Sequence, residues 1–203
     1  MNLLRKSLVL LFLAFLVFPG FSQEEPDSAP PPEAPLYTLG DQTFSFNVGL
    51  FFPLFFSDTS WNFTSASENL SLGGVGSLEW NSYINSKMLL GAQLSGMFSI
   101  TPNSRTLSMV PVCAKFSYIL DFFPVTVPLT VAAGFSFNKL DTLFEFTPIV
   151  KPGASVLWYL NNEWSLGLNL NYWWVPEIHF GDLADQTRFG SFLEASFAAV
   201  YHF

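Results

Sequence analysis

The sequence predicts an all-β protein, a membrane-spanning, eight-stranded antiparallel up-and-down β-barrel. Of its 203 residues only 12% are charged and 50% are hydrophobic, whereas a soluble domain has about 25% charged residues. No run after the N-terminal segment approaches the ~20 apolar residues of a spanning helix, and apolar residues instead alternate with small polar ones. Because only helices and closed barrels satisfy every backbone group in lipid, this period of two predicts a barrel.

The N-terminus has the features of an export signal. Arg5 and Lys6 precede an apolar run at residues 8–18, which suits a signal peptide and is too short to span a bilayer. Small residues follow, so we expect cleavage after Ser22 and removal of residues 1–22. A retained membrane anchor is the alternative interpretation.

A linker and a single barrel domain are expected after the signal. Residues 23–42 hold five prolines and five acidic residues, which predict a solvated periplasmic linker rather than a packed element. The barrel is expected over residues 43–203. The net charge of −8 argues against a nucleic-acid partner, and the single Cys113 excludes an internal disulfide and is expected to be a buried filler.

Eight segments alternate between apolar and small polar residues, which is the pattern of strands with two unlike faces. The segment at 125–137 is the most regular, with Val, Leu and Phe at odd positions and Thr, Ala, Gly and Ser at most even ones. Proline cannot donate to a strand ladder, so Pro111, Pro128, Pro148 and Pro152 weaken the assignment, above all for the fourth and sixth segments. The predicted strands are residues 43–52, 70–80, 88–99, 107–118, 125–137, 145–158, 164–174 and 189–203.

The polar face of these segments distinguishes a membrane barrel from a soluble one. A soluble exterior needs many charged residues, but this face is mostly Ser, Gly, Asn and Thr, which suits a crowded interior. A secreted soluble barrel remains the alternative. Aromatic residues gather near the strand ends, as expected for girdles at the two lipid interfaces: Trp80, Tyr83, Tyr118, Trp158, Trp164 and Tyr201 at one level, and Tyr172, Trp174, Phe137 and Phe189 at the other.

The chain resembles the small outer-membrane barrels of the OmpA transmembrane domain, OmpX and OmpW group. The resemblance rests on the signal peptide, the eight alternating segments and the aromatic C-terminus, and it covers residues 43–203 as pattern. Phe197, Tyr201 and Phe203 resemble the terminal signal read by the outer-membrane assembly machinery. The resemblance implies a bacterial outer-membrane location, with lipid and that machinery as partners.

Four charged residues on the polar face are expected to form two ion pairs in the lumen, Glu79 with Lys115 and Lys151 with Glu194. An unpaired buried charge costs several kcal/mol, so pairing is close to obligatory. Filling the lumen is the favoured role, and a gate or proton path is the alternative. Large apolar residues on the same face either fill the interior or mark errors in register: Met97, Ile149, Trp173, Phe192 and Val200. A narrow hydrophobic passage, if present, would be lined by Met97, Met109, Ile149, Trp173 and Phe192.

The expected function is structural or surface interaction through extracellular loops, with a closed or nearly closed lumen, because eight strands leave room only for side chains. A porin-like but narrow channel for small hydrophobic molecules, as proposed for OmpW-type proteins, is the alternative, and a lipid-acting enzyme using His179 is a weaker one. We expect no enzyme activity, cofactor or metal site. Phe51, Phe52 and Phe55 are expected at the lipid interface, and Trp61, His179 and Phe180 are the loop candidates for an extracellular ligand.

Overall fold

The computed structural model describes residues 37–60, 62–66, 70–100, 106–140, 143–178 and 187–203. Among these residues, no helix is long and apolar enough to cross a membrane. The expected signal peptide, residues 1–22, and the expected linker up to residue 36 lie outside the described residues. The strands are β1 (Gln42–Asp58), β2 (Phe63–Ser65), β3 (Gly73–Asn85), β4 (Met88–Ile100), β5 (Thr106–Phe122), β6 (Val125–Leu140), β7 (Leu143–Tyr159), β8 (Trp164–Glu177) and β9 (Arg188–His202).

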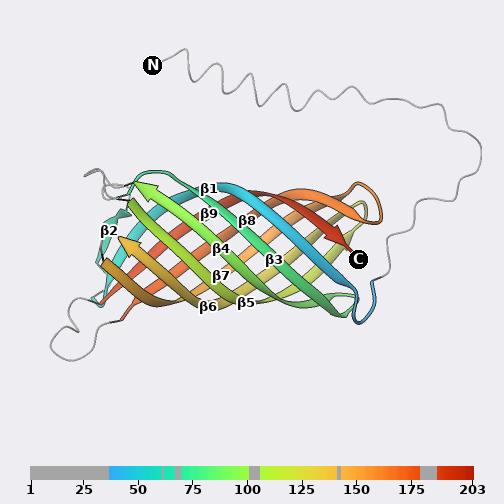
Figure 1. Cartoon of the computed structure of the whole chain (residues 1–203), viewed down its shortest axis with the longest axis horizontal. Helices are drawn as coiled ribbons and strands as arrows, with labels where there is room; N and C mark the ends of the chain where they lie inside the picture. Colours follow the sequence, from blue (N-terminus) through green and yellow to red (C-terminus); the bar gives the residue numbers. More distant parts are fainter. Residues whose placement is uncertain (1–36, 61, 67–69, 101–105, 141–142, 179–186) are drawn as a thin grey trace, which may run out of the picture. The chain divides into compact units, whose positions relative to one another are not determined.

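Eight of these strands close into a barrel (Figure 1). Each long strand pairs antiparallel with the next in the chain, and β1 pairs with β9 to close the sheet. The three-residue β2 pairs with the end of β1 and lies outside the ring of eight. The predicted fold class, a closed eight-stranded up-and-down β-barrel, is therefore confirmed.

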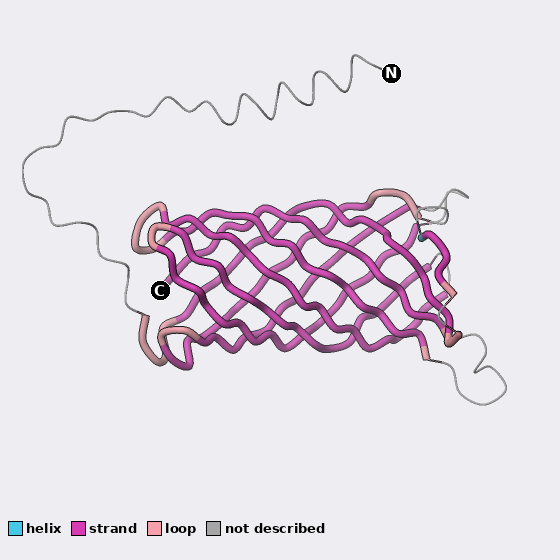
Figure 2. Tube along the Cα trace, turned by 180° about the vertical axis from the view of Figure 1, so that it is seen from behind, coloured by secondary structure: helices cyan, strands magenta, loops and turns pink. Residues whose placement is uncertain are grey.

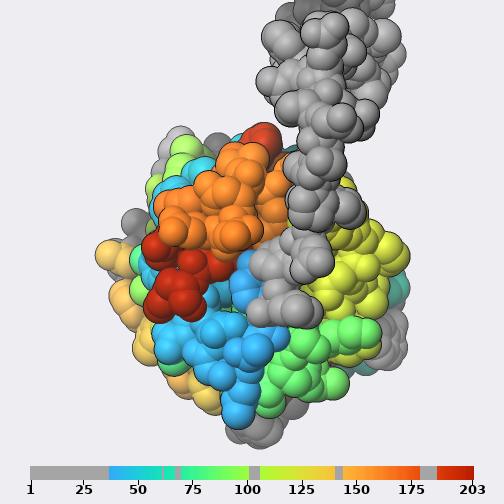
Figure 3. Space-filling view, turned by 90° about the vertical axis from the view of Figure 1, so that its right-hand side faces the viewer, coloured from blue at the N-terminus to red at the C-terminus, as the bar shows by residue number. Residues whose placement is uncertain are grey.

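The two ends of the barrel differ. At one end lie the start of β1, the C-terminus and the short turns β3–β4, β5–β6 and β7–β8; we call it the terminal end. Figure 3 looks onto this end. The opposite end, here the loop end, carries the connections after β1, β4, β6 and β8. All eight strands run obliquely from one end to the other (Figure 2), as barrel closure requires.

The apolar face of each strand points outward. On β1, Phe44, Phe46 and Val48 are 43–54% exposed, whereas the alternating Ser45 and Asn47 are at most 4% exposed. The same alternation holds on the other barrel strands, so the outside is a wall of Phe, Leu, Val and Trp. A surface of this kind is unusual on a soluble monomer.

Three prolines interrupt one ladder each and leave the other intact. In an antiparallel sheet the N–H and C=O of one residue point to the same neighbouring strand, so a missing N–H affects one ladder only. Pro111 keeps its pairing with β6 and lies in a gap of the β4–β5 ladder. Pro128 and Pro152 lie in gaps of the β6–β7 and β7–β8 ladders respectively. The fourth and sixth predicted strands therefore exist despite their prolines.

Three placements expected from the sequence are wrong. Phe51, expected at the lipid interface, lies in the lumen and is 0% exposed. It is part of β1, four residues after the inward-facing Asn47, so its side chain points to the same side of the strand. Tyr83 is 2% exposed rather than part of a girdle, because it shares the inward phase of Glu79. Leu70, expected on the outer face of a strand, precedes β3 and packs into the lumen.

Candidate functional site

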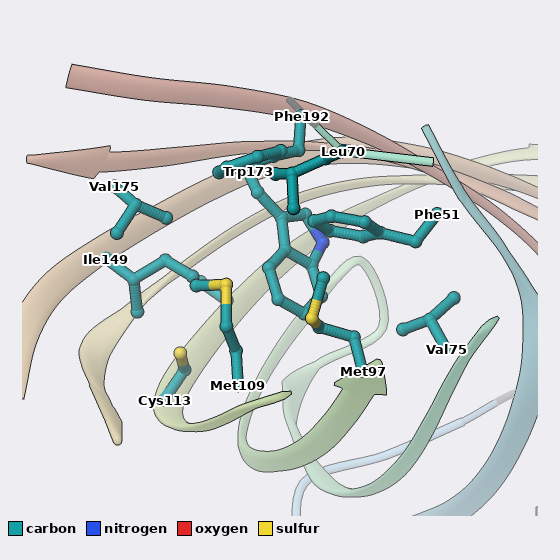
Figure 4. Close-up of a cluster of buried hydrophobic side chains, with 11 residues drawn as sticks. Phe51, Leu70, Val75, Met97, Met109, Cys113, Ile149, Trp173, Val175 and Phe192 are labelled. Carbon is teal, nitrogen blue, oxygen red and sulfur yellow. The ribbon is translucent and has the colours of Figure 1, made fainter. Parts of the chain in front are cut away.

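The half of the lumen nearer the loop end contains a cluster of buried apolar side chains, here called the apolar plug (Figure 4). Trp173 and Phe51 are fully buried with their rings edge to face at 5.1 Å, and Phe192 stacks on Phe51 at 5.0 Å. Interior packing, rather than an error in register, therefore explains the large apolar residues of the polar face. The plug comprises Phe51, Leu70, Val75, Met97, Met109, Cys113, Ala132, Ile149, Trp173, Val175 and Phe192.

The first buried ion pair joins Lys151 of β7 and Glu194 of β9, with 3.6 Å between Lys151 Nζ and Glu194 Oε2. Both side chains are 1% exposed. Lys151 also donates to Ser95 Oγ at 3.0 Å and lies 4.0 Å from the ring centroid of Trp173. A cation over an aromatic face is stabilised by the ring quadrupole, so this ammonium has three partners in place of water.

The second ion pair joins Lys115 of β5 and Glu79 of β3. The other oxygen of Glu79 accepts hydrogen bonds from Asn47 Nδ2 at 3.0 Å and Gln93 Nε2 at 2.6 Å. Every oxygen of this buried carboxylate is thus bonded, which is the condition under which a buried charge is tolerated. The structure brings together both pairs that the sequence predicts.

The two pairs share one arrangement. In each, the lysine and the glutamate come from strands separated by one other strand, and that middle strand supplies a neutral donor to the carboxylate. Gln93 of β4 donates a hydrogen bond to Glu79, and Trp173 Nε1 of β8 donates one of 2.7 Å to Glu194. Each pair therefore ties three strands together across the lumen.

A cavity of about 50 Å³, lined by both polar and apolar side chains, lies on the terminal side of these charges. Glu79 and Lys115 form part of its lining, with small polar residues of several strands. Asn47 Oδ1 and Asn81 Oδ1 are buried there and accept no hydrogen bond from the described residues. A space of this size and polarity suits ordered water, which commonly satisfies such atoms.

Aromatic rings close the terminal end of the lumen. Tyr37, which precedes β1, stacks on Tyr83 at 4.6 Å and on His202 at 5.1 Å, and its ring lies 6.4 Å from that of Tyr159. Burial raises the pKa of the Tyr37 phenol above its ordinary value, so the ring is neutral at physiological pH. His202 Nε2 lies 2.9 Å from Ser165 Oγ.

The remaining predicted residues lie on the outside or outside the described part. The girdle residues point outward at the barrel ends: Trp80, Tyr118, Trp158, Trp164, Tyr172 and Trp174. Phe197 and Phe203 are 71% and 58% exposed, and Tyr201 lies between them on the same face. Phe55 lies half-buried against Phe63, ring centroids 5.3 Å apart. The loop candidates Trp61, His179 and Phe180 fall outside the described residues.

Sequence reasoning missed Tyr37 as a lumen residue. The prolines and acidic residues before β1 predict a solvated linker, and Tyr37 is one aromatic residue in that context. An aromatic residue following a proline-rich acidic stretch was the available signal. The partners that fix its position, Tyr83, Tyr159 and His202, come from three separate strands, and no spacing rule connects them.

Comparisons with solved structures show the fold. Neisserial surface protein A aligns with a TM-score of 0.60 and 12% identity, covering 81% of this chain and 97% of that one. The outer membrane protein OprG from Pseudomonas aeruginosa aligns with a TM-score of 0.52 and 7% identity, covering 82% and 97%. Both are small outer-membrane barrels.

Comparisons of sequence reach spirochaete proteins of uncharacterised function. A protein of Borreliella burgdorferi is 24% identical over 171 residues, which is 73% of this chain and 78% of that one. A protein of Treponema pallidum is 30% identical over 98 residues, which is 46% of this chain and 34% of that one. A family model matches residues 24–201. The chain belongs to this family of uncharacterised proteins, and it has the closed eight-stranded fold of outer-membrane barrels.

Proposed function

We propose that the protein is an integral outer-membrane barrel with a closed lumen, whose role is structural or depends on surface contacts through the loop end. The occluded lumen is the observation that carries the proposal. Trp173, Phe51 and Ile149 are at most 1% exposed, and so are the charged Lys151 and Glu194 beside them. A diffusion pore needs a water-filled path, and these side chains occupy its place.

The outer surface supports residence in a bilayer. Outward residues at mid-height of the strands are apolar and about half exposed, such as Val112 at 50%, Val131 at 50% and Leu168 at 55%. Larger amphipathic rings, including Trp158 at 55%, lie nearer the ends. An apolar band between aromatic girdles is the surface that a membrane barrel presents.

The unequal ends support an orientation. Bacterial barrels place short turns in the periplasm and longer loops outside the cell. The terminal end would then face the periplasm, together with the linker, and the loop end would face outward. Phe63 and Ile178 near the loop end are 63% and 49% exposed, and loops on a rigid scaffold often bind partners. The proposal includes an extracellular ligand at these loops and no catalytic step.

Solute flux through the purified barrel in liposomes tests the closed lumen. We expect the wild-type protein to pass neither ions nor a small apolar solute. The double variant Phe51→Ala with Trp173→Ala removes two rings of the apolar plug and should admit ions. Trp174→Ala is the matched control, because Trp174 is 40% exposed on the outer face of the same strand, and it should stay closed.

Two results for the wild type would overturn the closed lumen. Ion conductance would make the protein a pore. Flux of the apolar solute without ion conductance would instead favour the narrow hydrophobic channel. Orientation has a separate test: a cysteine at Ile178 should react with an impermeant maleimide on intact cells, and failure to react would place the loop end inside.

A further inference from the structure

Tyr37 occupies the mouth of the lumen at the terminal end. Its ring makes stacked contacts with Tyr83 and His202, and that of Tyr159 lies at 6.4 Å. These three partners come from β3, β9 and β7, so a single side chain from the segment before the barrel bridges three separated strands. Removing it would leave three aromatic side chains facing an opening.

A short turn aims Tyr37 at this mouth. Thr38 N donates to Asp41 Oδ2 at 2.7 Å, and Gly40 has a positive φ of 99°, which a residue with a side chain rarely adopts. Gly40 N donates to Tyr83 O at 3.0 Å, and Tyr83 N donates to Asp41 O at 2.8 Å. The turn is thereby tied to β3, and it reverses the chain so that Tyr37 lies over the lumen.

The space behind Tyr37 is a cavity with both polar and apolar residues in its lining. The cavity includes Tyr83, Tyr159 and His202 in its lining and extends to Glu79 and Lys115. Beyond that ion pair lies the apolar plug, which begins on β5 at Cys113, one inward position past Lys115. Water and small polar solutes that enter from the terminal end would therefore meet this cluster of buried apolar side chains.

We propose that Tyr37 is a removable latch that controls access of water-soluble molecules to the terminal half of the lumen, while the plug keeps the loop half closed. The latch is held by aromatic stacking and by one turn, contacts that open locally without unfolding a strand. The inference goes beyond the closed-barrel function, because it assigns the two halves of the lumen separate closures, one mobile and one fixed.

Two cysteines on β5 flank Lys115 and test this division. Ser117 lines the cavity behind Tyr37 and is 3% exposed, and the native Cys113 of the plug is also 3% exposed. The reporter for the cavity is Ser117→Cys in a Cys113→Ala background, and the reporter for the plug is the native thiol. Each is treated in detergent with aminoethyl methanethiosulfonate, a small cationic reagent, and modification is followed by intact mass.

With Tyr37→Ala, the cavity cysteine should react at least about tenfold faster than with the native Tyr37, because three ring contacts are lost. Tyr37→Phe keeps the stacking and should protect as well as the native residue. Cys113 should react slowly in every variant. Mobility on gels with and without boiling checks that each barrel is folded.

Equal reaction rates of the cavity cysteine with and without Tyr37→Ala would overturn the latch. Acceleration of Cys113 by the same change would overturn the division of the lumen. If Tyr37→Ala does not fold, Gly40→Val provides the second variant. A Cβ at this position meets nothing within 4 Å, but a side chain disfavours the φ of 99°. The substitution should therefore loosen the turn and accelerate the same reaction, and no acceleration would contradict the proposal.

Discussion

The indole Nε1 of Trp173 donates a hydrogen bond of 2.7 Å to Oε2 of Glu194. That oxygen is also the one nearest Lys151 Nζ, and the ammonium lies over the ring of Trp173. Trp173 thus contacts both charges and belongs to the apolar plug as well. One side chain therefore joins the buried ion pair to the apolar plug at the centre of the lumen.

Breaking the Lys151–Glu194 pair should destabilise the barrel. Glu194→Gln leaves an uncompensated buried ammonium, and we expect the free energy of unfolding to fall by about 3–5 kcal/mol. The double variant with Lys151→Met should recover much of this loss, since no lone charge remains. Urea unfolding in lipid vesicles, followed by tryptophan fluorescence, measures the changes. Lys139→Met, at an exposed lysine, is the control. An equal loss of stability in this variant would contradict a stabilising role specific to the buried pair.

Gly134 should not tolerate a side chain. A Cβ built at this inward position of β6 collides with the carbonyl oxygen of Val112 on β5, so Gly134→Ala must separate two paired strands. We expect a loss of ~1–3 kcal/mol, typical of overpacking. Gly96 on β4 has open space at the Cβ position, and Gly96→Ala should be neutral in the same unfolding experiment. Similar effects of the two substitutions would show that close strand approach is not the cause.

A charge at mid-height on the outer face should cost far more than one near an end. Val131 lies at the middle of β6 and Ile100 at the loop end of β4, and their exposed fractions are 50% and 51%. In a bilayer we expect Val131→Arg to cost ~2–4 kcal/mol and Ile100→Arg about 0–1 kcal/mol. Unfolding in vesicles measures both, and equal costs would contradict a lipid band around mid-height.

The C-terminal aromatic residue should matter more for assembly than for stability. Phe203 closes the barrel through backbone bonds with Gln42, at 2.9 and 3.0 Å, which do not need its ring. Phe203→Ala should therefore fold in detergent as the native chain does, yet reach the outer membrane of cells in several-fold lower amount. Phe44→Ala, an outward ring on β1, is the control. Equal amounts in the membrane would argue against a terminal assembly signal.

Alternation predicted the strands well because each barrel strand separates two environments. The inward and outward faces of β6, and the inward position of the charges on β3, β5, β7 and β9, follow from the alternation of side chains along each strand. The same alternation places Met97 and Trp173 inside. From the sequence alone, however, an apolar residue on the inward face can mean either an apolar interior or a wrongly assigned register. The reason is that half of this lumen is packed like a soluble core, so polarity alone does not mark its inward face.

The errors arose where strands end. β1 runs six residues beyond the predicted limit at residue 52. Phe51 lies next to that limit, and grouping it with the aromatic residues that follow overlooks its inward position in the alternation of the strand. Leu70 lies before a strand that begins at Gly73, where alternation no longer applies. Tyr37 is held by a turn and three distant rings, and such tertiary contacts leave no period in the sequence.

The most direct test of the account is the solvent accessibility of a spin label at Val131, introduced as cysteine in a Cys113→Ala background and reconstituted in lipid vesicles. Because Val131 lies outward at mid-height of the barrel, the label should collide often with oxygen, which concentrates in acyl chains, and rarely with a water-soluble nickel chelate. Frequent collision with the nickel chelate would place this face in water and contradict the membrane barrel.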